Sequence, residues 1–209
     1  SGFDQFTDPS GCDCWQVSNG LWAAGAPSAP PVAHSGYWCA GAMLSGDYPD
    51  GADTRLISSS ILIPSITGCE NLRLRFWHWY RLSDLDWAQV EIQTRRGTSW
   101  GPWTAFRGSD VSSYTGYGPL WTYPAIDMSS YADSLVRISF HFVTARDYWG
   151  TPSEDRGWLI DDVAILKGRS ADPVAPVVES FENGIGNWLV DRGQWEVGVP
   201  AGSPSAHNG

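Results

Sequence analysis

Two neighbouring carboxylates stand in an apolar stretch in the second half of the chain. Asp161 and Asp162 interrupt the run 158–165 (WLIDDVAI), and strand geometry sends neighbouring side chains to opposite faces. One of the two is therefore expected to point inward. A buried carboxylate must be paired or bound to a metal, and oxygen ligands in an acidic protein suit Ca²⁺ better than a transition metal.

A second acidic cluster runs from Asp47 to Asp53 (DYPDGAD). Asp53 is a further candidate calcium ligand, at the same site or at another. The spacing is not that of an EF-hand, because Ser58 occupies the twelfth position, where a bidentate Glu is required. Asp47 and Asp50 are interpreted as solvated turn residues.

Motifs that could support catalysis lack the structural context that catalysis needs. Residues 97–101 (GTSWG) satisfy G-x-S-x-G, but Pro102 follows at once, without the helix of a nucleophile elbow. The motif is interpreted as a hairpin turn. Glu91 with Asp84 or Asp86 would imitate the carboxylate pair of a glycosidase, yet nothing in the sequence fixes their separation. We therefore predict that the protein is not an enzyme.

The four histidines are scattered, at His34, His78, His141 and His207, and no HExxH is present. His34 and His207 are one position of a repeat, which favours a structural hydrogen-bonding role. His78 alternates with apolar residues and is predicted to be a core histidine that has a hydrogen-bond partner.

The cysteines, Cys12, Cys14, Cys39 and Cys69, are four in number. Cys12 and Cys14 are too close to pair comfortably with each other, so each is expected to form a disulfide with Cys39 or Cys69, in either arrangement. Reduced thiols are the alternative, and zinc is less well supported because C-x-C differs from the usual ligand spacing. Two disulfides would indicate an exported protein.

Apolar residues alternate with a period of two through most of the chain, which predicts strands. In 71–80, Leu, Phe, His and Tyr share one face and Arg and Trp the other. No segment has the pattern of a long amphipathic helix. We predict an all-β fold, a two-sheet antiparallel β-sandwich of the jelly-roll type. The expected strands are 54–60, 71–80, 87–94, 120–126, 135–143 and 158–166.

The composition is that of a globular protein, with 42% hydrophobic and 17% charged residues. The formal net charge of −10 argues against a nucleic acid or an anionic membrane surface as the main partner. No run approaches the 18 or so apolar residues of a membrane span.

The chain repeats itself at a spacing of a whole domain. Residues 15–36 match 188–209 without a gap, and ten of the 22 positions are identical. We therefore predict one complete module at 1–168, a Pro/Ala linker at 169–176, and the first strands of a second, incomplete module at 177–209. The recurring tryptophans of the repeat are interpreted as framework residues.

A series of short motifs gives the chain a family resemblance. The start of the second module has FENGIGNW, W-x-V-G-x-P and AHNG. The body of the first module has, in chain order, LISSSILIP, LRFWHWY, VEIQ, RGTSW, IDMSSYA, VRISFHF and GWLIDDVAI. The succession resembles the MAM-like jelly-roll domain of immune inhibitor A-type secreted metallopeptidases. It resembles cleaved adhesin domains and galactose-binding-like carbohydrate-binding modules more distantly. The resemblance covers nearly all of the first module and implies a non-catalytic appendage.

The resemblance also implies a structural Ca²⁺. Such domains commonly hold it with an acidic residue that follows the first-strand Phe and with an Asp of the IDDV strand. The matching positions are Asp4 with Asp161 or Asp162, and Glu182 in the second module.

A ligand surface is expected where aromatic residues lie in loops, because aromatic rings stack on sugars and anchor protein interfaces. The loop 111–119 (VSSYTGYGP) has the Ser, Tyr and Gly content of an adaptable recognition loop. The predicted ligand-binding residues are Tyr114, Tyr117, Tyr148 and Trp149, and further loop aromatics are Tyr37, Tyr48 and Trp103.

Three functions fit these features. The first is a calcium-stabilised adhesion module of a secreted bacterial tandem-repeat protein, which binds a glycan or a protein at an extracellular or cell surface. The second is a subunit of an extracellular fibre, in which copies of the chain complete the strands of 177–209. The third is an accessory domain of a secreted peptidase or glycosidase.

Overall fold

A computed structural model describes residues 15–106, 113–146 and 155–169 of the 209-residue chain. The strands are β1 (Trp15–Ser18), β2 (Trp22–Gly25), β3 (Cys39–Ala42), β4 (Asp53–Ser58), β5 (Ile61–Leu62), β6 (Glu70–Arg81), β7 (Trp87–Arg96), β8 (Ser99–Trp100), β9 (Thr104–Ala105), β10 (Ser113–Tyr114), β11 (Tyr117–Thr122), β12 (Ala125–Asp127), β13 (Leu135–Val143) and β14 (Gly157–Arg169). The short 3-10 helix η2 (Ser129–Tyr131) joins β12 to β13.

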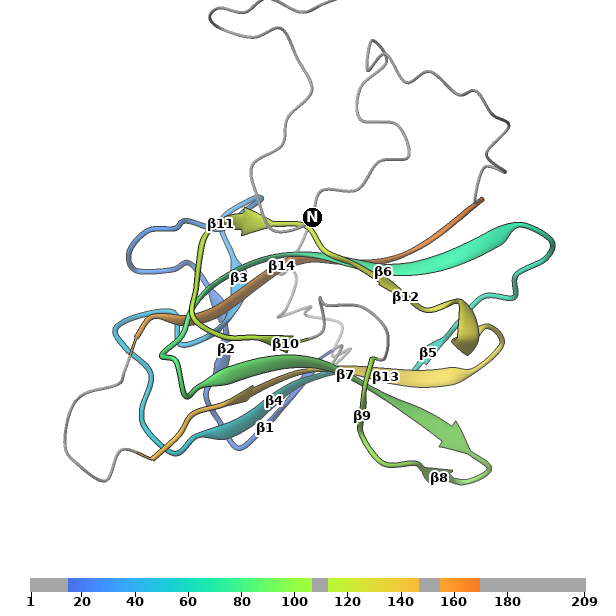
Figure 1. Cartoon of the computed structure of the whole chain (residues 1–209), viewed down its shortest axis with the longest axis horizontal. Coiled ribbons are helices and arrows are strands. Elements are labelled where there is room, and N and C mark those ends of the chain that lie inside the picture. Colours follow the sequence, from blue (N-terminus) through green and yellow to red (C-terminus); the bar gives the residue numbers. More distant parts are fainter. Residues whose placement is uncertain (1–14, 107–112, 147–154, 170–209) are drawn as a thin grey trace, which may run out of the picture.

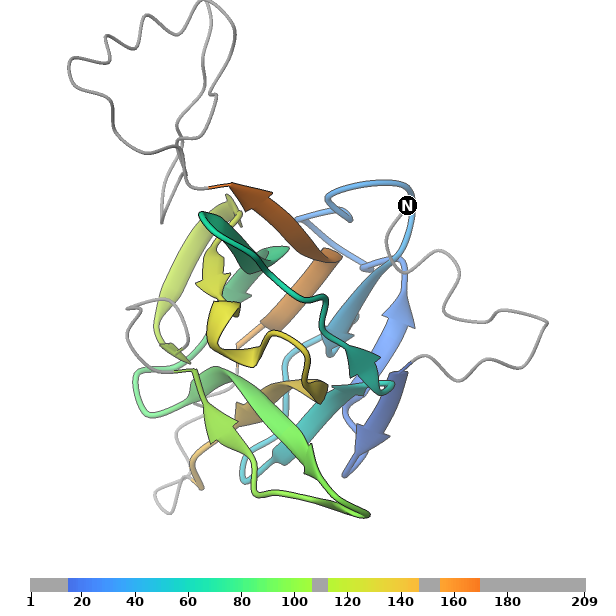
Figure 2. The same ribbon diagram turned by 90° about the vertical axis from the view of Figure 1, so that its right-hand side faces the viewer.

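The strands form two antiparallel sheets that pack face to face, as Figures 1 and 2 show. The first sheet has the order β1-β4-β13-β7-β10, and the second has the order β11-β6-β14-β3-β2. The long strands are divided between the layers, with β6 and β14 in the second sheet and β7 and β13 in the first. The predicted two-sheet β-sandwich is confirmed.

The core fills the space between the sheets, and strand alternation explains which residues reach it. In β6, Leu72, Leu74 and Phe76 are fully buried between the layers. From the other sheet, Phe140 packs against Phe76 with 5.1 Å between ring centroids. Apolar side chains at every second position therefore meet across the sandwich, which is how a half-buried sheet is stabilised.

The repeated tryptophans of the first module belong to this framework, as predicted. Trp22 is buried and meets Trp158 edge to face, at a centroid distance of 5.7 Å. Trp15 is half-buried and packs against Phe140 at 5.9 Å. The repeat therefore preserves positions that hold the sheets together.

The observed strands agree with the predicted ones to within a few residues, except at 120–126. There the chain forms β11 and then β12, and Tyr123 and Pro124 lie between them. Proline has no N–H to donate to a sheet, so it ends the pairing of β11 with β6. No helix among the described residues is long and apolar enough to cross a membrane.

The domain prediction is not tested, because 170–209 lies outside the described residues. Strand β14 continues through Arg169, one residue into the predicted linker. The second module at 177–209 stays a prediction.

Candidate functional site: a groove on the second sheet

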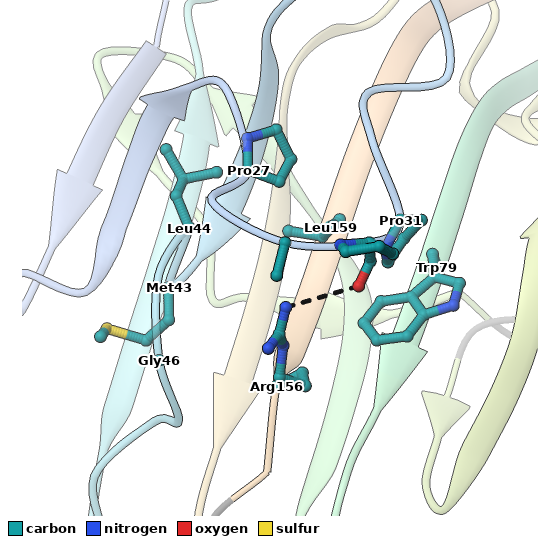
Figure 3. A pocket seen from close by; sticks show the side chains of 10 residues that line it. Pro27, Pro31, Met43, Leu44, Gly46, Trp79, Arg156 and Leu159 are labelled. Carbon is teal, nitrogen blue, oxygen red and sulfur yellow. Dashed lines mark hydrogen bonds between the residues drawn. The ribbon is translucent and has the colours of Figure 1, made fainter.

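A groove of about 320 Å³ lies on the outer face of the second sheet. This volume is at the lower end of the range of roughly 300–1,000 Å³ that is usual for ligand sites. Beside it is a water-sized recess of about 10 Å³, drawn in Figure 3, which shares Trp79 and Arg156 with the groove. The groove is lined by Ala29, Pro30, Pro31, Trp79, Arg81, Tyr117, Pro119 and Arg156.

The sheet register places these residues side by side. Trp79 and Arg81 occupy outward positions of β6, because His78 and Leu82 next to them point into the core. Tyr117 of β11 stands directly opposite Arg81. On the other side Arg81 pairs with Gly157 of β14.

The aromatic residues of the groove differ in exposure. Trp79 is only 6% exposed, so it forms part of the floor. Tyr117 is 61% exposed, and the Arg81 guanidinium carbon lies 5.6 Å from the centroid of its ring. Tyr117 is therefore exposed beside the groove, and its contact with a ligand stays a prediction.

The two arginines are positioned by neighbouring groups. Arg81 Nε lies 2.9 Å from the carboxylate of Asp155. An Nη group of Arg156 donates a long hydrogen bond of 3.4 Å to the Pro30 carbonyl, the dashed line in Figure 3. Each guanidinium ion carries five N–H groups, so these contacts use only a minority of the donors.

One side of the groove is formed by a loop, residues 26–38. The loop connects β2 to β3 and crosses the outer face of the second sheet. The loop contains the cis peptide between Pro30 and Pro31. Trp121 Nε1 donates to the Val32 carbonyl at 3.1 Å, and Ser28 N donates to the Leu44 carbonyl at 2.8 Å. The loop is thus attached near its start to the segment after β3, and at its middle to Trp121 of β11.

The paired carboxylates of β14 form the strongest attachment of this loop. Ser35 N donates to Asp161 at 3.1 Å, and Ser35 Oγ donates to Asp162 at 2.7 Å. His34 Nδ1 lies 3.0 Å from the second oxygen of Asp162. His34 is therefore a structural hydrogen-bonding residue, as predicted.

A bulge in β14 explains how both carboxylates reach the loop. Asp161 pairs with Trp77 and Ala164 pairs with Arg75, so β14 has one residue more than β6 over this stretch. Asp162 accommodates the extra residue by adopting a left-handed backbone conformation, with a φ of 47°. The expected inward carboxylate is Asp161, which is fully buried but lies beneath the loop, outside the core between the sheets.

Burial raises the pKa of Asp161, although the backbone N–H groups of Ser35 and Asp162 oppose the rise. Each of its oxygens accepts one of these hydrogen bonds, at 3.1 Å from Ser35 and 2.8 Å from Asp162. The buried carboxylate therefore has hydrogen-bond partners without a metal.

The calcium prediction is not tested by the described residues. No group of three or more His, Cys, Asp or Glu side chains suited to a metal occurs in 15–106, 113–146 and 155–169. Asp53 lies in the first sheet, where it contacts His141, whereas Asp161 and Asp162 contact Ser35. Asp4 and Glu182 lie outside the described residues. Calcium stays a prediction.

A stack of side chains continues the groove along β6, and the sequence did not reveal it. The Arg75 guanidinium lies 3.7 Å from the Tyr123 ring centroid, and the Tyr123 ring stacks on Trp77 at 4.7 Å. His34 lies on Trp77 at 3.8 Å. These contacts form a stack of aromatic, histidine and arginine side chains along the outer face of β6.

A polar cluster on the outer face of the first sheet contains Glu91, which was considered for a glycosidase pair, and Asp53, which was considered as a metal ligand. His141 Nε2 lies 2.8 Å from Asp53, and His141 Nδ1 lies 3.1 Å from Glu91. Arg55 Nε donates to Glu91 at 3.0 Å. Burial acts to raise the pKa of Glu91, but its hydrogen bonds with His141 and Arg55 outweigh burial and lower the pKa.

The other carboxylates and the G-x-S-x-G motif are also structural. Asp86 is buried, and it accepts hydrogen bonds from Tyr48 Oη at 2.6 Å and from Ala145 N at 2.7 Å. Ser99 lies in β8, which pairs back on β7 as the predicted hairpin. His78 is buried and accepts from Trp158 Nε1 at 3.2 Å, which confirms it as a core histidine.

The prediction of a ligand-binding role is wrong for two tyrosines, Tyr114 and Tyr48. Tyr114 is 3% exposed, because β10 pairs with β7 and turns the ring into the core. Tyr48 is fully buried, where its hydroxyl donates to Asp86. Tyr37 is exposed, and Trp103 is half-buried. Tyr148 and Trp149 lie outside the described residues.

The disulfide prediction is not confirmed for Cys39. Its thiol is free and lies beneath the loop with Trp79 and Leu159. Burial, with the neighbouring Asp161 carboxylate, raises the pKa of Cys39 to about 12, so the thiolate is suppressed. Cys69 is exposed in the turn before β6, and Cys12 and Cys14 lie outside the described residues.

Several residues of the groove were not identified from the sequence. Trp79 and Arg81 occupy outward positions of a strand that was predicted correctly, and that position was the available signal. Arg156 and the Pro30–Pro31 peptide carry no such signal, because only the folded chain brings them to β6.

Comparison with known proteins adds a distant relationship. No family model matches the chain. Bacillopeptidase F of Bacillus subtilis (strain 168) is 29% identical over 169 residues. The match covers 79% of the chain but only 10% of that protein.

Two solved structures are similar in part. TmCBM61 in complex with β-1,4-galactotriose has a TM-score of 0.47 and 14% identity, over 81% of this chain and 94% of that one. The K3 cleaved adhesin domain of Lys-gingipain from Porphyromonas gingivalis w83 has a TM-score of 0.40 and 15% identity, over 73% and 91%. The fold assigned above rests on the strand pairing of the chain itself. In length, the chain spans about a tenth of Bacillopeptidase F.

Proposed function

We propose that the chain is a non-catalytic binding module for glycans, and that the groove on the second sheet is the binding site. The observation that carries this proposal is the exposed ring of Tyr117 beside two arginines in a groove of about 320 Å³.

The chemistry of the groove suits a sugar. The C–H faces of a pyranose ring are flat and apolar, so they stack on an aromatic ring such as that of Tyr117. The rings of Pro30, Pro31 and Pro119 add apolar surface around it. The N–H groups of Arg81 and Arg156 supply donors for hydroxyl groups, and a few polar groups in a largely apolar site are what orient a small ligand.

The same groove offers little to a catalytic mechanism. Its described lining residues include no carboxylate, histidine, cysteine or serine that could act as a general acid, a general base or a nucleophile. Glu91 and His141 form hydrogen bonds with each other on the other sheet. These features support binding without a chemical step.

The relationship to Bacillopeptidase F supports a place for the module within a larger exported protein. A match to a tenth of a protein named as a peptidase suggests that the module is an appendage rather than the peptidase unit. In this proposal the module holds its parent protein at a glycan-bearing surface.

Binding of oligosaccharides to the purified chain, measured by isothermal titration calorimetry and on a glycan array, tests the proposal. Replacing Tyr117 with alanine should weaken binding about tenfold or more, because truncating a central aromatic contact commonly costs more than about 1 kcal/mol. Tyr37→Ala is the matched control, since Tyr37 is 84% exposed and does not line the groove. Equal losses in the two variants, or no glycan bound at millimolar concentration, would contradict the proposal.

A further inference from the structure

We infer that the groove selects glycans that carry carboxylate groups, such as those built from uronic acids. This inference rests on the proposed function and names the ligand class of the same site. It begins from charge, because the chain has a net charge of −10 whereas the ionic groups that line the groove are Arg81 and Arg156.

The groove is a cationic spot on an acidic protein. None of its described lining residues is acidic. Asp155 pairs with Arg81 and offsets one positive charge, which leaves the charge of Arg156. A negatively charged ligand would therefore be attracted to this groove in preference to the rest of the acidic surface.

The Arg81 guanidinium is held in place before a ligand arrives. Asp155 contacts Arg81 Nε, so the planar fork of Nη groups is oriented. Arg156 donates to the Pro30 carbonyl through a long hydrogen bond of 3.4 Å, and a stronger acceptor would easily replace this carbonyl.

A carboxylate is the acceptor that such a fork recognises best. Guanidinium ions bind carboxylates through two parallel hydrogen bonds, which are about twice as strong as those between neutral groups. A neutral sugar in the same place would cover the charge of Arg156 without a counterion, and desolvating a charge without a partner is unfavourable. The groove thus discriminates against neutral glycans as well as attracting acidic ones.

The apolar rings identify the acidic ligand as a sugar rather than a peptide. Tyr117 and the three prolines offer flat surfaces that match pyranose faces. Strand β6, which supplies Trp79 and Arg81, is paired on both of its sides, so it offers no free edge to an extended peptide.

The test compares three ligands of equal length by calorimetry with the whole chain. They are tetragalacturonate, its carboxyl-reduced neutral counterpart, and tetraglutamate as an acidic peptide. We expect tetragalacturonate to bind about tenfold or more tightly than the neutral sugar, and its binding alone to weaken when salt is raised from 50 to 300 mM. Tetraglutamate should show no binding.

Three variants assign the effect to the groove. Arg156→Gln should remove the preference, so that the acidic and the neutral sugar bind with equal affinity, whereas Tyr117→Ala should weaken both and keep the preference. Arg95→Gln is the control, because Arg95 lies in the β7–β8 hairpin of the first sheet. A melting curve equal to that of the wild type shows that each variant is folded.

The outcomes separate the two proposals. Equal affinity for the acidic and the neutral sugar would overturn the inference and leave glycan binding intact. Equal affinity for tetraglutamate would also overturn it, in favour of an acidic protein partner. Failure of every sugar to bind would refute the proposed function itself.

Discussion

Replacing Asp161 with alanine should destabilise the protein because the carboxylate is the acceptor for two backbone groups beneath the groove loop. Asp161 is fully buried and accepts from Ser35 N at 3.1 Å and from Asp162 N at 2.8 Å. Alanine has no acceptor, and the loop covers the site, so both N–H groups would lose their partner.

The two donors set the size of the effect. A buried donor without a partner costs about 1–3 kcal/mol, so two would cost about 2–6 kcal/mol. Part of this cost is offset, because burial of the charged carboxylate is itself unfavourable, as its raised pKa indicates. We expect a loss of about 3 kcal/mol in the free energy of unfolding, which for a chain of this size lowers Tm by about 6–12 °C.

The assay is urea unfolding together with calorimetry, in the presence of a chelator so that no metal contributes. Asp161→Asn keeps one acceptor oxygen and should lie between alanine and the wild type. Asp84→Ala is the control, because Asp84 is exposed, and it should change stability by less than about 0.5 kcal/mol. If Asp161→Ala melts within about 2 °C of the wild type, hydrogen bonding by Asp161 does not hold the loop and the reasoning is refuted.

Three further predictions concern metal, backbone and pH. If calcium binds beside the paired carboxylates, millimolar Ca²⁺ should raise the Tm of the wild type but not of Asp162→Ala, since a ligand of the folded state stabilises it by mass action; identical curves in calcium and chelator would exclude the metal. Gly157→Ala should cost about 3 kcal/mol in urea unfolding, because its φ is 90° and a Cβ there would lie 2.5 Å from the Ala42 carbonyl oxygen, whereas Gly20→Ala, with a φ of 75° and nothing within 4 Å, should cost only about 1 kcal/mol; equal costs would show that the close approach is unimportant. The pKa of Glu91 is lowered in the folded state, so its contribution is present above the unfolded pKa of about 4.3 and is lost as pH falls through the folded value. Glu91→Gln should therefore lower Tm at pH 7 and flatten its decline in acid, and a pH profile parallel to that of the wild type would contradict this.

Much of the fold could be predicted because strand formation and burial are written in a local pattern. The alternation in 135–143 gives β13 with both of its ends correct. The pattern in 71–80 gives the inward face of β6 with Leu72, Leu74 and Phe76 in the core. The alternation in 120–126 did not predict the division into β11 and β12, although Pro124 was a local indication of a break.

A residue of the candidate site could be predicted only where its own type and sequence context indicated a ligand contact. Tyr117 was identified as an aromatic residue in a loop sequence and is exposed at the groove. Tyr114, only three residues away, has the same local signal and is buried. The difference between them is the strand with which each pairs, because β10 joins β7 in the first sheet and β11 joins β6 in the second.

By itself, the sequence determined the fold class, the faces of the long strands and the importance of Asp161 and Asp162, since each depends on residues close together in the chain. The tertiary structure decided what those carboxylates contact and where a ligand can bind. Ser35 reaches Asp161 across 126 positions, and Arg156 reaches Pro30 across the same separation. Such contacts follow from the pairing of distant strands and from one bulge in β14, which no local pattern of residue types specifies.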